Sequence, residues 1–372
     1  MRAVLAAVVL VGLAFAVMLR TGQQQAAIAR VVAQSEAAAS SGSPEGLRQA
    51  AALTSEATGG DDRAPAILHA QGAKAELAYW SLYHGSDSQA ARADELLEAA
   101  QIRGARDAET ALATALYEAT RGDPAAALRL LDGDSTGTGT PWHAVARSEA
   151  LLRSGDLIGA RAALGGCDAG LCRSFGAQLA LDLGDLAAAQ ALGDALVAAT
   201  PDHVLGRTAQ VLAAGAGLND QERVRRLTEF MEQTALPPRQ SALVVVALSR
   251  ALRRTSGAER ADELLERGLE AAPDAALLAR EVARTKRYQG HFGAAWNGAD
   301  KALRSISADP GLVAELAASL FMNDADELLD SRLEAARRRS PQGEATRRGE
   351  AVLALIRGDH AAAIAGLDAT RH

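Results

Sequence analysis

A short pattern recurs along most of this chain: a glycine, an alanine five residues after it, and a small residue seven residues before it. In the clearest instance Asp185 follows Gly184, Ala177 and Ala189 occupy the two spacings, and Pro201 comes later. The other instances are Ala115, Gly122 and Ala127; Ser148, Gly155 and Ala160; Ala283, Gly290 and Ala295; and Ala351, Gly358 and Ala363. A supersecondary unit that returns at a regular period predicts an array of repeats in place of a single core.

Each recurring glycine is interpreted as the turn between two helices. Glycine adopts the left-handed conformation that ends a helix, and the Asp or Asn that often follows suits the first cap of the next helix. The candidate turns lie mostly about 33 or 34 residues apart, a common repeat length, at Gly85, Gly122, Gly155, Gly184, Gly217, Ser256-Gly257, Gly290, Asn323-Asp324 and Gly358. Prolines are expected to end the second helix of several units, because proline cannot continue a helix interior; these are Pro201, Pro273, Pro310 and Pro341.

The composition favours an all-α fold. Hydrophobic residues make up 48% of the chain but aromatic residues only 3%, so the apolar content is mostly alanine and leucine. Such side chains suit helices that pack closely through small residues, whereas a sheet favours β-branched and aromatic side chains.

A helix–turn–helix unit of this length resembles the tetratricopeptide repeat (TPR). Ala177, Gly184, Ala189 and Pro201 match four of the family's positions, and the resemblance covers residues 64–372 with about eight repeats. It implies an α-solenoid that acts without catalysis as a scaffold and binds peptide or protein partners in a groove. Singly anchored members of the family serve bacterial envelope complexes, which gives the expected type of role. Most of the family's large aromatic residues are missing here, so the units near Gly217 and Asn323 have uncertain edges.

The N-terminus carries an uninterrupted apolar run over residues 3–19, flanked by Arg2 and Arg20. Its length is close to the shortest helix that spans a bilayer. Residues 1–22 are therefore expected to be a signal anchor that keeps the protein in the membrane, or a cleaved signal peptide that leaves it secreted. In both cases the body is expected outside the cytoplasm, in the periplasm. Residues 23–63 are expected to form a linker and irregular capping helices.

The two cysteines, Cys167 and Cys172, lie in a short loop between two expected repeats. In an exported protein they are candidates for a disulfide. An alternative function is a redox-linked accessory module of an envelope enzyme that acts through this pair. A further alternative is a structural spacer.

The sequence shows no catalytic, cofactor-binding or metal-binding motif, and its net charge of −7 does not favour a nucleic-acid partner. The expectation is a non-enzyme without cofactors. Two groups are candidates for partner contact: the aromatic residues Tyr79, Trp80 and Tyr83, and the basic residues Arg337, Arg338 and Arg339.

Overall fold

The computed structural model describes residues 2–61, 63–83, 87–104, 107–133, 139–154, 156–255, 257–273, 275–305, 310–321, 329–331, 333–334, 337 and 344–368. Side chains are described for most of these from residue 21 onward. All the regular secondary structure in these ranges is α-helical. The helices are α1 (Arg2–Ala39), α2 (Pro44–Thr58), α3 (Ala66–Tyr83), α4 (Asp87–Gly104), α5 (Ala108–Thr120), α6 (Pro124–Gly133), α7 (Pro141–Ser154), α8 (Leu157–Gly165), α9 (Gly170–Asp182), α10 (Leu186–Ala199), α11 (Val204–Ala216), α12 (Asp220–Gln233), α13 (Pro238–Arg254), α14 (Ala258–Ala271), α15 (Ala276–Tyr288), α16 (Phe292–Ser305), α17 (Pro310–Phe321), α19 (Glu344–Ile356) and α20 (His360–Asp368).

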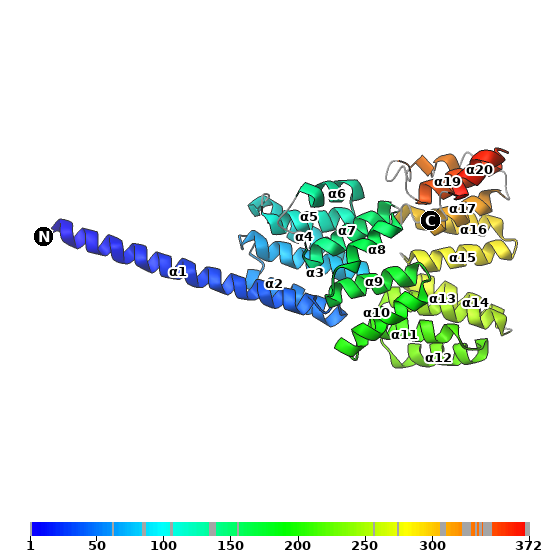
Figure 1. Cartoon of the computed structure of the whole chain (residues 1–372), viewed down its shortest axis with the longest axis horizontal. Helices are drawn as coiled ribbons and strands as arrows, with labels where there is room; N and C mark the ends of the chain where they lie inside the picture. The colour runs from blue at the N-terminus through cyan, green and yellow to red at the C-terminus, as the bar shows by residue number, and fades with distance from the viewer. Residues whose placement is uncertain are drawn as a thin grey trace.

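The helices pack in consecutive pairs, and the pairs stack into an extended array (Figure 1). We call the first helix of a pair its A helix; α3, α5, α7, α9, α11, α13, α15, α17 and α19 are A helices, and successive A helices from α3 to α17 are in contact. The α1 helix extends far beyond the rest of the molecule, and α15 to α20 lie at the opposite end (Figure 1). The architecture is therefore all-α and TPR-like.

The small residues of the repeated pattern lie at the closest helix contacts. All ten are at most 3% exposed, namely Ala115, Ala127, Ser148, Ala160, Ala177, Ala189, Ala283, Ala295, Ala351 and Ala363. Small side chains let the backbones of the paired helices approach, and buried leucines fill the space beside them. The core is divided into clusters along the array, as expected where each unit packs mainly on its neighbours.

The turns follow the expected chemistry in some units. Gly184, Gly290 and Gly358 adopt positive φ angles of 74°, 80° and 80°. Asp185 accepts a hydrogen bond from the backbone N–H of Ala188 and so caps the start of α10. Such a cap satisfies one of the free N–H groups of the first helical turn.

Other turns differ from the expectation. Gly217 has a φ of −85°, and the residue that caps the end of α5 is Arg121, not Gly122. Pro310 begins α17 and does not end the preceding helix, since its missing N–H costs nothing in a first turn. Pro201 and Pro273 follow the ends of α10 and α14, and Gly155 and Pro341 lie outside the described residues.

The N-terminal helix is continuous from Arg2 to Ala39, and α2 folds back along it. Among the helical residues whose side chains are described, no stretch is long and apolar enough to cross a membrane. The apolar run at residues 3–19 lies outside that set.

Candidate protein-binding surface

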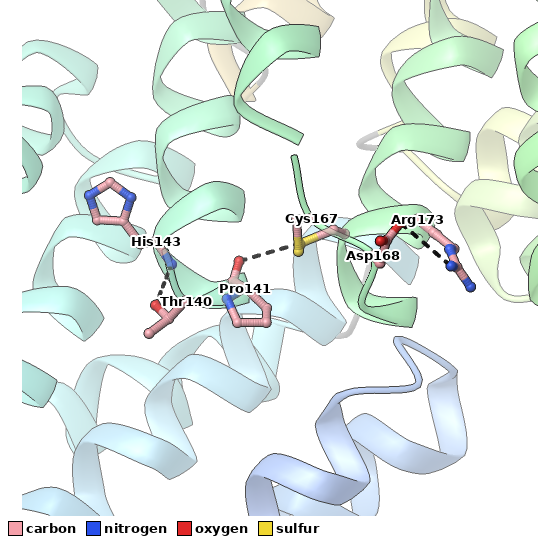
Figure 2. Close-up of a disulfide and its surroundings, with 7 residues drawn as sticks. Thr140, Pro141, His143, Cys167, Asp168 and Arg173 are labelled. Atoms are coloured by element: carbon pink, nitrogen blue, oxygen red, sulfur yellow. Dashed lines mark hydrogen bonds and ion pairs between the residues drawn. A yellow bond between two sulfur atoms is a disulfide. The ribbon is translucent and has the colours of Figure 1, made fainter. Parts of the chain in front are cut away.

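A disulfide joins Cys167, in the loop between α8 and α9, to Cys172 in the first turn of α9. Cys172 is buried, and its sulfur lies 3.8 Å from the carbonyl oxygen of Pro141 at the start of α7 (Figure 2). On the other side of the loop Arg173 forms an ion pair with Asp168 at 3.7 Å. Cys167 is only partly buried.

The turn between α1 and α2 packs against the segment that this disulfide constrains. The backbone N–H of Leu171 donates to the carbonyl oxygen of Ser40 at 2.8 Å, and the hydroxyl of Tyr83 donates to the carbonyl oxygen of Gly42 at 2.6 Å. A Cβ on Gly42 would lie 2.4 Å from the hydroxyl oxygen of Ser174. Helices α1 and α2 form an N-terminal hairpin, and the turn between them is thus fixed to both α3 and α9 through close backbone contacts.

The aromatic residues at the end of α3 serve these internal contacts. Tyr83 is fully buried, and Tyr79 is 8% exposed and accepts a hydrogen bond from Arg48 on α2 at 2.7 Å. The guanidinium carbon of Arg121 lies over the ring of Trp80, 5.1 Å from the centre of that ring. The burial of Tyr79 and Tyr83 favours a role in internal packing over the predicted contact with a partner.

The end of α3 also meets the start of α13, far along the chain. The buried amide of Gln240 donates to the carbonyl oxygen of Leu82 at 2.9 Å, and Arg239 donates to the carbonyl oxygen of Ser81. Arg239 also pairs with Asp182 on α9 at 2.5 Å. These contacts join α13 to both α3 and α9.

A buried ion pair occupies the same side of the array nearer the N-terminus. The ammonium of Lys74 on α3 is fully buried and lies 2.5 Å from the carboxylate of Glu109 on α5. Gln71 donates to Glu109 at 3.3 Å and to Glu36 of α1 at 3.0 Å. Burial lowers the pKa of Lys74, although the charge of Glu109 opposes the shift. Lys74 and Gln71 are therefore buried and paired within the chain, whereas Glu109 is 30% exposed and Glu36 is exposed.

The situation differs on α13, α15 and α17, where arginines bridge successive A helices. Arg250 on α13 donates through Nε and Nη2 to the two oxygens of Glu281 on α15, at 2.9 and 2.7 Å. Arg284 and Arg287 on α15 donate to the two oxygens of Glu315 on α17, at 2.8 and 3.0 Å. The two carboxylates are buried, whereas 42% of the Arg250 side chain and 38% of the Arg284 side chain stay exposed.

Arg280 extends this group along α15. It lies four residues before Arg284, so both are on one face of the helix. Its Nε is buried and has no hydrogen-bond partner within the described part of the chain. We call Arg250, Arg280, Arg284 and Arg287 the arginine row. Beside the row, Tyr288 is 73% exposed, with the guanidinium of Arg287 4.8 Å from its ring centre.

Sequence reasoning missed this group, although a signal was present. Arg250 and Arg284 lie 34 residues apart, as do Glu281 and Glu315. A charge that recurs at the repeat period takes the same place in successive units. The arginines that were singled out lie elsewhere: Arg337 pairs with Asp330 and Glu350, each at 2.9 Å, and Arg338 and Arg339 are outside the described residues.

In the described ranges, no group of three His, Cys, Asp or Glu side chains is arranged to hold a metal ion. The surface that stands out is therefore a partly exposed row of positive charge beside an exposed aromatic ring. Guanidinium groups can donate paired hydrogen bonds to carboxylates and phosphates.

The chain matches no protein-family model and no curated protein. Among solved structures it is similar to the Cut9–Hcn1 hetero-tetramer of the APC/C, with 12% sequence identity and a TM-score of 0.50. That similarity covers 87% of this chain and 63% of the other, so this chain spans less than two thirds of that relative.

Two further solved structures are similar at lower scores. The human IFIT1 dimer with m7Gppp-AAAA shows 15% identity over 90% of this chain and 72% of that one, with a TM-score of 0.38. The TPR domain of P58(IPK) shows 13% identity over 87% and 88%, with a TM-score of 0.25. At such identities the likeness concerns the fold alone, and the chain has a TPR-like helical-repeat fold.

Proposed function

We propose that this protein is a non-catalytic scaffold that binds a partner protein on the A-helix face of α13, α15 and α17. The observation that carries the proposal is the group of arginines on α13 and α15 that bridge successive A helices beside the exposed ring of Tyr288. Some polar side chains of the A helices, such as Lys74 on α3 and Gln240 on α13, are buried and paired within the chain. By contrast, the side chains of Arg250 and Arg284 stay partly exposed.

An exposed aromatic ring next to arginines has the composition of a binding hot spot. Tyr and Arg are enriched among residues that dominate interface energies, because both combine a large apolar surface with directional hydrogen bonds. TPR-like arrays are suited to such a role, since stacked repeats present an extended surface.

Site-specific photocrosslinking in the native cell tests this function. A photoreactive phenylalanine analogue replaces Tyr288 in one strain and Arg267 in a matched strain. Arg267 lies on α14, the second helix of its pair, and its side chain is 69% exposed. The proposal expects one defined cross-linked protein from position 288 and none from position 267. The same products from both positions, or none from either, would favour a spacer without a specific partner.

We further propose that the apolar run at residues 3–19 anchors the protein in a membrane and that the body lies outside the cytoplasm, in a bacterial envelope complex. The run has nearly the length of a membrane span, and a disulfide suits an oxidising compartment. Alkaline carbonate extraction tests the anchor: the protein should remain in the membrane pellet. Release into the supernatant, with a chain shortened at its N-terminus, would indicate a cleaved signal peptide.

A further inference from the structure

We propose that the arginine row binds an acidic, extended segment of the partner protein, with acidic side chains at every third position. This inference rests on the proposed function, because it names the chemistry of the partner at the same surface. It is argued from the charges, the internal pairing and the spacing of the row.

The row presents positive charge although it contains carboxylates. Four arginines face two glutamates, and the glutamates are the buried members, with side chains 7% and 6% exposed. The side chains of Arg250 and Arg284 are 42% and 38% exposed, so a ligand that approaches this surface meets the arginines before the buried carboxylates. The rest of the chain is acidic, with a net charge of −7 overall, which makes a basic surface of this kind distinctive.

The internal ion pairs also hold the arginines in place. A free arginine side chain loses up to about 2 kcal/mol of conformational free energy when it is immobilised. Arg250, Arg284 and Arg287 have already been immobilised by Glu281 and Glu315. A guanidinium has five N–H groups, and the pairing of Arg250 uses only its Nε and Nη2 atoms. Further N–H groups remain for a ligand carboxylate, which would bind to a preorganised site.

The spacing of the helices sets the spacing of the ligand charges. Packed helices lie about 8–10 Å apart, and Arg250 and Arg284 occupy equivalent places on neighbouring A helices. A polyproline II segment advances about 3.1 Å per residue with three residues per turn, so every third side chain lies on one side, about 9 Å from the next. Two acidic residues at this period match Arg250 and Arg284, while Arg280 and Arg287 lie beside Arg284 along α15.

An anionic membrane surface fits the position of the row less well. The row lies on α13 and α15, toward the end of the molecule that is remote from the N-terminal part of α1 (Figure 1). If α1 is anchored in a bilayer, α15 is held away from that bilayer.

A labelled peptide tests the proposal with the full-length protein in detergent. The probe is a nine-residue peptide of three Glu-Pro-Pro repeats, acetylated at its N-terminus, amidated at its C-terminus and labelled with fluorescein. Fluorescence anisotropy should show saturable binding, weakened at least fivefold when the salt rises from about 50 to 200 mM. A peptide with Gln in place of Glu should bind at least tenfold more weakly.

Arg280→Glu should weaken binding of the acidic peptide at least tenfold. The Nε of Arg280 has no hydrogen-bond partner among the described residues, so its replacement breaks no hydrogen bond of that atom there. Arg280→Gln is a second, milder variant with an expected loss of about threefold, and circular dichroism checks that both are folded. Arg267→Glu on α14 is the matched control and should leave binding unchanged.

Three results would overturn the inference: no binding of the acidic peptide to the wild-type protein, equal binding of the Gln peptide, or equal losses in the Arg280 and Arg267 variants. Arg280-dependent binding of phosphatidylglycerol vesicles without peptide binding would assign the row to lipid and would also overturn it. If the peptide fails but Tyr288 still cross-links to one protein, the partner chemistry is wrong and the protein-binding function stands.

Discussion

Glu281 and Glu315 occupy equivalent places on α15 and α17, and each accepts hydrogen bonds from arginine on the preceding A helix. The ion pairs therefore follow the repeat and join three successive units side by side. They orient the arginine row while removing its counter-charges from the surface.

The pairing at Glu281 predicts a defined pH dependence of stability. Burial alone raises the pKa of the Glu281 carboxyl, but the hydrogen bonds and charge of Arg250 and the charge of Arg284 outweigh it, so the pKa lies below its ordinary value. Since the pKa is lower in the folded state than in the unfolded state, the stabilisation is complete above about pH 4.3 and is lost as the pH falls through the folded pKa.

Glu281→Gln should therefore lower the free energy of unfolding at pH 7 by about 1–3 kcal/mol, and the difference from wild type should shrink as the pH falls from about 4.5 to 3. Urea unfolding of the full-length protein in detergent at several pH values measures this. Glu263→Gln, at a 68% exposed side chain on α14, is the control and should change stability little. A Glu281 effect that stays constant down to pH 3 would contradict the electrostatic explanation.

The contact between α3 and α13 should contribute strongly to stability. Gln240→Ala removes the donor to the carbonyl oxygen of Leu82 and leaves that oxygen without this partner in a buried site. The expected loss is about 1–3 kcal/mol of unfolding free energy. Gln190→Ala, at an exposed position on α10, is the matched control and should change stability by less than about 0.5 kcal/mol. Equal effects of the two substitutions would show that α3 and α13 do not depend on each other.

The N-terminal hairpin is expected to be sensitive to one added methyl group. Gly42 and Gly59 have similar positive φ angles of 64° and 59°, but only Gly42 lies against other residues. Alanine at Gly59 should cost about 1 kcal/mol because of the left-handed backbone alone. Alanine at Gly42 should cost about 2 kcal/mol more, because its Cβ would overlap Ser174 and the backbone of Leu171. Thermal unfolding of both variants decides this; similar melting temperatures would argue against docking of the turn on α9.

The disulfide should stabilise the segment that receives this hairpin. Replacing both Cys167 and Cys172 by Ser should lower stability by about 2 kcal/mol, since the closed loop is short. Hydrogen exchange at the amide of Leu171 should become faster, because that amide donates to Ser40 next to the bond. Reductant should reproduce both changes in the wild type and have no effect on the double variant. An unchanged exchange rate at Leu171 would show that docking of the hairpin does not depend on the disulfide.

The repeat architecture was predictable because small residues at close helix contacts leave a period in the sequence. Ala177, Gly184 and Ala189 carry that information locally, within a single unit. The closure of α3 on α13 was not predictable, because Gln240 meets Leu82 across four intervening pairs of helices and neither belongs to the repeated pattern. For the same reason the hydrogen bond of Tyr83 to Gly42 was not predictable: Gly42 comes from the α1–α2 hairpin that precedes the array.

The central claim is that the protein binds its partner through the arginine row on α13 and α15. The most direct measurement is the yield of the Tyr288 cross-link in native membranes when Arg280→Glu or Arg267→Glu is added to the same chain. We expect at least a tenfold lower yield with Arg280→Glu and an unchanged yield with Arg267→Glu, at equal protein levels. Equal yields in the two variants would contradict it.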